Sequence, residues 1–177
     1  MLDLLFPLKN KRLKKNKRFF HFQEVFQEPV DSIIRDFRAA GLGSIPGGGG
    51  EILVDRVRKR IAPLKAMSDE WLGVMDAAHR QGLASTATMM FGHVETLQER
   101  FDHLVRIRAV QAEKPASSNG FLAFIPWPYQ DDGTLLNRVK GIKNQVSPDE
   151  YVRMLAISRI MLPNIINIQA SWLTVGR

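Results

Sequence analysis

A chain of 177 residues with 45% hydrophobic content and a formal charge of +7 has the size and composition of one globular domain, which excludes a disordered protein. It contains no run of about 18 apolar residues, so the sequence excludes a membrane-spanning helix. It also contains no cysteine, which excludes disulfides and thiolate ligands for zinc or an iron–sulfur cluster.

Residues 1–28 form a basic segment that we expect to be poorly structured and separate from a domain of residues 29–177. Residues 9–18, KNKRLKKNKR, hold seven Lys or Arg and no acid. A solvated basic run can bind nucleic acid or anionic lipid. It has no aromatic side chain for stacking on bases, so we favour a disordered tail and expect neither a nucleic-acid nor a membrane partner. The apolar opening precedes the charges, the reverse of a secretory signal, so we expect a cytoplasmic protein.

Helix signals begin near residue 30 and alternate with short apolar runs. The first predicted helix is capped by Asp31 or Ser32 and stops at Gly41. The second is capped by Ser68 and stops at Gly82. Both have apolar residues spaced to form one buried stripe, so each is expected to cover a core.

Two later helices carry stronger capping signals. Thr96 and Glu99 predict a capping box, in which each side chain accepts a hydrogen bond from the backbone of the other residue. Ser147 predicts another cap, strengthened by Pro148 at the first helical position, and Pro163 ends that helix. The residues predicted to face inward from the helix after Thr96 are Phe101, Leu104 and Val105.

Between the helices lie runs short enough to be strands, at residues 41–46, 84–92, 120–127 and 165–173. They are rich in β-forming residues and mostly do not alternate, which is typical of parallel strands buried on both faces. The pattern therefore predicts an α/β fold, either a doubly wound sheet or a closed barrel.

Polar and aromatic residues follow the predicted strands, as they do on the active-site face of a (β/α) barrel. This clustering favours the barrel over the sheet. A whole barrel needs eight strands in about 250 residues, and only four units can be counted. The sequence therefore predicts a partial TIM-type (β/α) barrel of about four β/α units.

The run Gly47, Gly48, Gly49 and Gly50, followed by Glu51, is the most unusual segment. It matches neither the dinucleotide-binding nor the P-loop glycine motif, so phosphate binding is not indicated. A flexible turn would explain one or two glycines. Four glycines beside a carboxylate favour a ligand that lies against bare backbone.

The histidines do not form a metal site, because no two of them have ligand spacing. His79 is predicted to be a surface residue or a partner of the dipole at its helix C-terminus, and His103 to be structural. His93, just after a buried run, can reach a cavity. No G-x-S-x-G motif is present, and no catalytic residue can be assigned from the residues alone.

Four segments closely resemble a known family: AGLGSIPGGGGEILVDRVRKRIAPLK, STATMMFGHVET, GFLAFIPWPYQ and LAISRIMLPNIINIQASW. In one register, over about residues 29–176, they resemble the cyclic dehypoxanthine futalosine synthase family (dehypoxanthine futalosine cyclase) of radical S-adenosylmethionine enzymes. The resemblance implies a TIM barrel that uses S-adenosylmethionine and a [4Fe–4S] cluster held by a C-x-x-x-C-x-x-C loop. It also implies a nucleoside substrate, dehypoxanthine futalosine, which is cyclised in menaquinone biosynthesis by the futalosine pathway.

The resemblance also implies roles for individual positions. Glu51 occupies the place of a carboxylate that contacts S-adenosylmethionine, and Gly47–Gly50 would let the backbone approach the cofactor or the nucleoside substrate. The residues expected to line the substrate side are His93, Glu95, Pro126, Trp127, Gln169 and Trp172.

The absence of cysteine departs from the family pattern. We therefore expect no cluster in this chain, and we hypothesise a truncated gene product that is inactive by itself. A non-catalytic, barrel-derived binding module or an inactive remnant is the alternative. The open edges of a partial barrel would also allow self-association.

Overall fold

The computed structural model describes residues 25–139 and 141–171 of the chain. Within these residues four parallel strands form one sheet, in the order in which they occur along the chain. The strands are β1 (Ser44–Ile45), β2 (Ala84–Phe91), β3 (Phe121–Pro128) and β4 (Asn167–Ile168). The α/β class with parallel strands is therefore confirmed.

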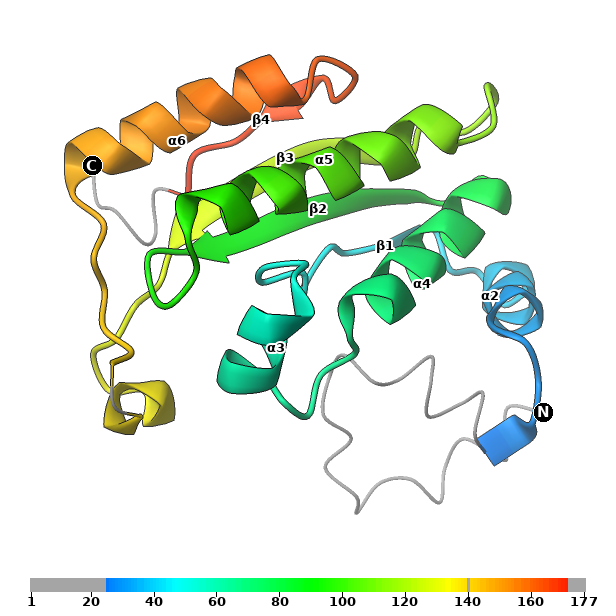
Figure 1. Cartoon of the computed structure of the whole chain (residues 1–177). Coiled ribbons are helices and arrows are strands. Elements are labelled where there is room, and N and C mark those ends of the chain that lie inside the picture. The colour runs from blue at the N-terminus through cyan, green and yellow to red at the C-terminus, as the bar shows by residue number, and fades with distance from the viewer. Residues whose placement is uncertain (1–24, 140, 172–177) are drawn as a thin grey trace.

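Helices connect these strands and cover the sheet. They are α2 (Val30–Ala39), α3 (Asp55–Ile61), α4 (Ser68–Arg80), α5 (Leu97–Glu113), the 3₁₀ helix η2 (Leu135–Arg138) and α6 (Pro148–Met161). Helices α4, α5 and α6 lie side by side over one face of the sheet (Figure 1). The opposite face includes Thr86, Ile125 and Trp127, which are only partly buried. In the described part of the chain, no helix combines the length and apolarity needed to cross a bilayer.

The two strong capping signals are confirmed, and the two weaker ones are wrong. Thr96 accepts from the Glu99 amide and Glu99 from the Thr96 amide, which closes the capping box before α5. Ser147 likewise caps α6, with Pro148 at its start. Helix α4 begins at Ser68, so its N-cap is Met67 and not Ser68. The Glu70 carboxylate accepts a hydrogen bond from the Met67 amide, at 2.7 Å.

Helix α2 shows a similar shift, of two or three residues. It is preceded by Pro29, and neither Asp31 nor Ser32 is its cap. Proline in an extended conformation removes an N–H that the first turn could not satisfy. The helix therefore begins earlier than the polar residues predict.

The outer strands are shorter than predicted. Strands β1 and β4 contain two residues each, whereas β2 and β3 contain eight each. Pro46 follows β1 directly and has no N–H to donate to a neighbouring strand. After β4, the Gln169 amide still donates to the Phe124 carbonyl, at 2.9 Å.

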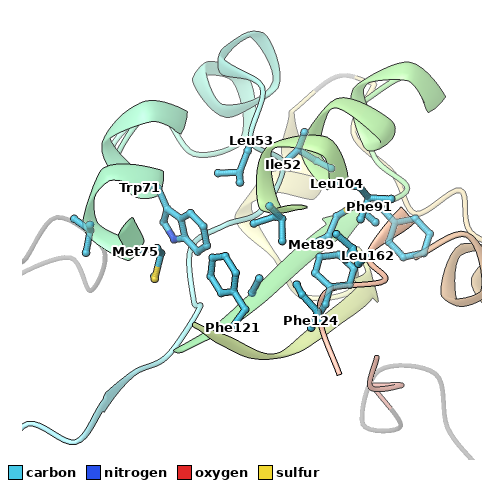
Figure 2. Packing of buried hydrophobic residues seen from close by; sticks show 14 of the residues in the cluster. Ile52, Leu53, Trp71, Met75, Met89, Phe91, Leu104, Phe121, Phe124 and Leu162 are labelled. Atoms are coloured by element: carbon cyan, nitrogen blue, oxygen red, sulfur yellow. The ribbon is translucent and has the colours of Figure 1, made fainter. Parts of the chain in front are cut away.

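The core lies between the sheet and the helices that cover it (Figure 2). Phe121 and Phe124 of β3 are 1% and 0% exposed, and Trp71 of α4 stacks on Phe121 at 6.2 Å between ring centroids. On α5, Leu104 is buried as predicted. The inward prediction for Val105 is wrong, because this side chain is 43% exposed. The buried face of α5 instead consists of Glu99, His103, Leu104, Ile107 and Gln111.

Replacing Phe124 should test the placement of this core. We expect Phe124→Ala to lower the free energy of unfolding by about 3–5 kcal/mol, because the substitution leaves a cavity under α5. Leu122→Ala on the same strand is the control. Leu122 is 43% exposed, so its loss should cost less than about 1 kcal/mol. Urea denaturation followed by circular dichroism measures both, and equal losses would contradict the arrangement.

Candidate functional site

The carboxyl ends of the parallel strands bring most of the predicted site residues to one edge of the sheet. Gly47–Glu51 follow β1, Gly92–Glu95 follow β2, and Trp127 lies near the end of β3, paired in register with Met90. Gln169 follows β4 and is exposed. Trp172 lies outside the described residues. This edge is the candidate site.

The glycine run lies against strand β2. The Gly47 amide donates to Thr86 Oγ1 at 2.9 Å, and Thr88 Oγ1 donates to the Gly47 carbonyl at 2.8 Å. A Cβ on Gly47 would overlap the Thr86 carbonyl, and one on Gly50 would lie 2.7 Å from the Thr88 carbonyl oxygen. These two glycines are therefore needed for a close approach of backbone to backbone.

The other two glycines differ in their surroundings. A Cβ on Gly48 would meet nothing within 4 Å, and Gly49 has a φ of 89°, a conformation that favours glycine. Contact of a ligand with Gly48 and Gly49 stays a prediction. Gly47 and Gly50, in contrast, have a structural reason that depends on β2.

Glu51 ends this segment in a strained conformation. Its φ is 40°, in the left-handed region that costs a non-glycine residue of the order of 1 kcal/mol. Its carbonyl accepts from the Met90 amide at 3.0 Å, and its carboxylate forms an ion pair with Lys65. The Glu51 side chain is 8% exposed and that of Lys65 is 37% exposed. A nearly buried carboxylate thus holds an ammonium group at the edge of the sheet.

Arg58 of α3 supports this segment and was not singled out from the sequence. It is fully buried, and among the described residues its guanidinium donates to backbone carbonyls: Gly49 at 3.0 Å, Gly50 at 2.6 Å, Ile52 at 3.4 Å and Ala66 at 2.8 Å. Burial lowers the pKa of Arg58, and the charge of Glu51 acts in the opposite direction. No sequence pattern indicates this role, because any residue can supply a carbonyl acceptor.

His93 and Glu95 are brought together, but inside the protein. Their side chains are 0% exposed, and His93 Nδ1 lies 3.0 Å from Glu95 Oε2. Glu95 also accepts from the Gly92 amide at 2.5 Å and the His93 amide at 3.0 Å. His93 Nε2 donates to the Met90 carbonyl at 3.1 Å. Burial acts to raise the pKa of Glu95, but the hydrogen bonds and charge of His93 and the backbone amides outweigh it and lower that pKa to about 2.

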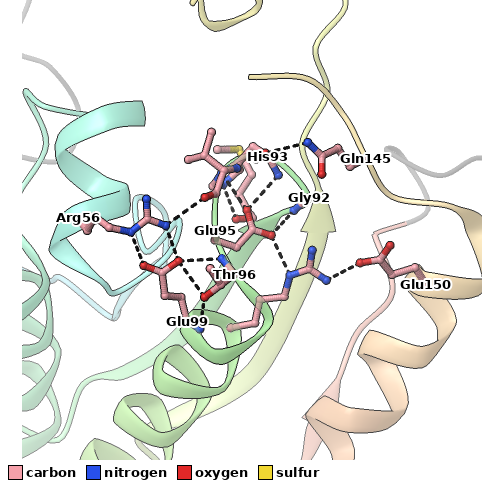
Figure 3. Close-up of polar contacts among 11 residues, drawn as sticks. Arg56, Gly92, His93, Glu95, Thr96, Glu99, Gln145 and Glu150 are labelled. Carbon is pink, nitrogen blue, oxygen red and sulfur yellow. Dashed lines mark hydrogen bonds and ion pairs between the residues drawn. The ribbon is translucent and has the colours of Figure 1, made fainter. Parts of the chain in front are cut away.

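Charged side chains connect this pair to the neighbouring helices (Figure 3). Arg100 donates to Glu95 at 2.8 Å and to Glu150 at 2.6 Å, which ties α5 to α6. Its guanidinium lies 4.9 Å from the centroid of the Phe91 ring. Arg56 binds Glu99 through two hydrogen bonds, at 2.7 and 2.6 Å. The geometry therefore gives His93 and Glu95 a structural role beneath the edge, and their contact with substrate stays a prediction.

The remaining buried histidines are not candidates for chemistry. The surface prediction for His79 is wrong: it is 0% exposed, and its Nε2 lies 2.7 Å from Ser85 Oγ beneath α4. Burial lowers the pKa of His79 to about 4 and that of His103 to about 3, so both are neutral near pH 7. Ser85 is 2% exposed, so this Ser–His pair has no access to a substrate.

No metal centre is evident either. Among the residues that the structure describes, no three His, Cys, Asp or Glu side chains are grouped so as to hold a metal ion. The edge instead has groups that can bind a ligand without chemistry. Glu51 is a buried carboxylate that can pair with a cationic group, and Met90 and Trp127 are partly buried side chains that can contact an apolar or aromatic group.

Comparison with known proteins identifies relatives of the chain. Residues 118–177 match the family described as the CofH/MqnC C-terminal region. The cyclic dehypoxanthine futalosine synthase of Streptomyces coelicolor is 45% identical over 157 residues, which are 89% of this chain and 37% of that protein. The aminodeoxyfutalosine synthase of Thermus thermophilus is 39% identical over 88% of this chain and 41% of its own length.

A third relative is named for a different enzyme. The 5-amino-6-(D-ribitylamino)uracil–L-tyrosine 4-hydroxyphenyl transferase 1 of Methanosarcina mazei is 37% identical over 89% of this chain and 42% of its own length. The fold and its edge define an α/β protein of the class that carries its site at the carboxyl ends of parallel strands. Within that class, the chain is similar over most of its length to cyclic dehypoxanthine futalosine synthases, at 45% and 39% identity. It spans 37%, 41% and 42% of the lengths of these three relatives.

Gly47→Ala tests the close approach to β2. We expect it to lower the free energy of unfolding by about 1–3 kcal/mol, because the added methyl overlaps the Thr86 carbonyl. Gly48→Ala is the matched control. It adds the same methyl group to open space and should change stability by less than about 0.5 kcal/mol. Thermal and urea unfolding compare the two, and a tolerated Gly47→Ala would refute the contact.

Glu95→Gln tests the buried carboxylate through pH. The pKa of Glu95 is lowered from 4.5 to about 2 in the folded chain, so its stabilisation is present above pH 4.5 and is lost as the pH falls toward 2. A change of this size corresponds to at most about 3 kcal/mol. The wild-type chain should therefore exceed the variant in stability at pH 7, and the difference should shrink below pH 4.5. Urea midpoints at several pH values measure this.

His79 and His103 also lose stabilisation in acid, because the unfolded chain protonates them first. They are present in both proteins, so their contribution cancels in the difference. A difference between wild type and Glu95→Gln that stayed constant from pH 7 to acid would contradict the lowered pKa.

Proposed function

We propose that residues 29–177 are about four β/α units of a TIM-type (β/α) barrel. The support is the strand order, which follows the chain without a reversal, and the three helices that lie over one face of the sheet (Figure 1). A doubly wound sheet reverses its strand order and carries helices on both faces. A singly wound sheet of this kind is the arrangement that closes into a barrel when further units are added.

The proposed activity is that of the cyclase family: conversion of dehypoxanthine futalosine to its cyclic product in menaquinone biosynthesis. The observation that carries it is the 45% identity to the cyclase of Streptomyces coelicolor over 89% of this chain. The identity to an aminodeoxyfutalosine synthase is 39%. The substrate is then a small nucleoside, and Trp127 with Met90 is the surface proposed to lie against it.

The residues of this chain do not fit the [4Fe–4S] cluster that the family implies. Such clusters are held by thiolates, and the chain has no cysteine. No step of the reaction is therefore assigned to a cluster on these residues. The absence of thiolate ligands supports the proposal that these residues do not catalyse the reaction by themselves.

Glu51 does fit one part of S-adenosylmethionine, which supplies the oxidising chemistry in this family. The carboxylate already pairs with the ammonium of Lys65, so its position suits the ammonium of an amino acid. Glu51 is the fixed member of the ion pair, because its backbone is bound to β2. The ammonium of Lys65 is on a long, partly exposed side chain, so a ligand ammonium can replace it. In this proposal Glu51 binds and orients the cofactor, and Lys65 gives way to it.

A chimera tests the proposed function. The aligned segment of the Streptomyces coelicolor cyclase is replaced by the aligned residues of this chain, and formation of the cyclic product is measured with iron and sulfide content. We expect product from the chimera, and a loss of about tenfold to a hundredfold in kcat/KM when it carries Glu51→Gln, since a charged hydrogen bond to the cofactor is removed.

The matched control for this experiment is Lys59→Gln, which changes an exposed residue of α3. It should leave kcat/KM of the chimera within about twofold of the unsubstituted chimera. A chimera that folds and holds its iron and sulfide but forms no product would overturn the proposal.

A further inference from the structure

Arg58 has surroundings that stability alone does not explain. Its side chain is fully buried, yet its hydrogen-bond acceptors within residues 25–139 and 141–171 include no carboxylate. Transferring a cation from water to the interior is costly, and an apolar residue of similar volume is often as stabilising or more so. A buried guanidinium that binds only carbonyls is therefore best understood by what it holds in place.

What it holds is the backbone on both sides of Glu51. Nη1 donates to the Gly50 carbonyl at 2.6 Å and to the Ile52 carbonyl at 3.4 Å. Nη2 donates to the Gly49 carbonyl at 3.0 Å. One rigid, planar group thus binds the peptide groups that follow Gly49 and Gly50, just before Glu51, and the peptide group that follows Ile52. The same guanidinium donates to Ala66 through Nε at 2.8 Å, next in sequence to Lys65.

The segment needs such a support. Gly49 and Glu51 both have positive φ values, 89° and 40°, and a run of glycines loses more conformational entropy on folding than other residues. The contacts of Gly47 with β2 fix only the start of the run. Without Arg58, Glu51 would keep one backbone contact to β2, from the Met90 amide.

We infer that Arg58 is a positioning residue, whose buried guanidinium fixes the left-handed backbone at Glu51 and so aims the Glu51 carboxylate at the ammonium group of a ligand. The inference rests on the proposed function, which supplies the ligand. Lysine cannot replace arginine in this role, because its single ammonium cannot reach carbonyls of two separate loops in one plane.

The test compares two ligands on the full chain by isothermal titration calorimetry: S-adenosylmethionine and its analogue that lacks the α-amino group. We expect wild type to prefer S-adenosylmethionine by about tenfold, the value of a charged hydrogen bond. Arg58→Gln and Arg58→Lys should bind the two ligands about equally, and Lys59→Gln should keep the wild-type preference. A purely structural role would weaken both ligands together and leave their ratio unchanged.

Amide hydrogen exchange on the same proteins follows the backbone directly. In the Arg58 variants we expect exchange to rise about tenfold or more in residues 48–53 while β2 and β3 stay protected. Arg58→Lys keeps the charge and most of the volume, so it remains informative if Arg58→Gln does not fold.

The two failures are distinguishable. If wild type prefers S-adenosylmethionine and the Arg58 variants keep that preference, the inference is overturned and the proposed function stands. If wild type shows no preference between the two ligands, the proposed binding role of Glu51 is wrong, and the positioning role for a ligand ammonium falls with it.

Discussion

Parallel pairing of β2 with β3 decides where the rest of the protein can lie. Their register joins seven residue pairs, from Ser85 with Phe121 to Phe91 with Pro128. Because the strands run the same way, each must be followed by a crossover, here through α5 and, between β3 and β4, through α6. The helices cover one face, and the loops that follow the strands gather at one edge. The candidate site is a consequence of that pairing.

Electrostatics divides the edge into two parts with different functions. Glu95 accepts hydrogen bonds from the amides of Gly92 and His93 and from the Arg100 guanidinium, and it lies beside the His93 ring, so its partners are all inside the protein. Glu51 is held by its backbone, and its carboxylate pairs with a partly exposed lysine. An acid whose partners are all fixed stabilises the fold, whereas an acid with an exchangeable partner can receive a ligand. The same residue type therefore stabilises the fold at one strand end and, in the proposed function, binds a ligand at another.

The parts of the fold that could be predicted from the sequence depend on neighbouring residues. Thr96 with Glu99 and Ser147 with Pro148 complete their hydrogen bonds within one helical turn, so the sequence contains the whole signal. His79 could not be placed in the same way, because its burial depends on Ser85 and on the Phe121 ring of another strand. The contacts of Arg58 could not be predicted from the sequence either, because its acceptors are backbone carbonyls of two loops and not side chains. Glu51 was singled out because of the glycines beside it, although Gly47 and Gly50 are needed for their contact with β2, and its contact with a ligand stays a prediction.

The glycine run also fixes a length. Thr86 and Thr88 project from the same side of β2 and bind the amide and the carbonyl of one residue, Gly47. Four positions later the Met90 amide binds the carbonyl of Glu51. Both ends of the loop, Gly47 and Glu51, are thus hydrogen-bonded to the same strand, β2. Inserting or deleting one residue between these anchors would transfer the left-handed position to a neighbour and turn the carboxylate to another side. Natural variation in this loop should therefore change its side chains and spare its number of residues.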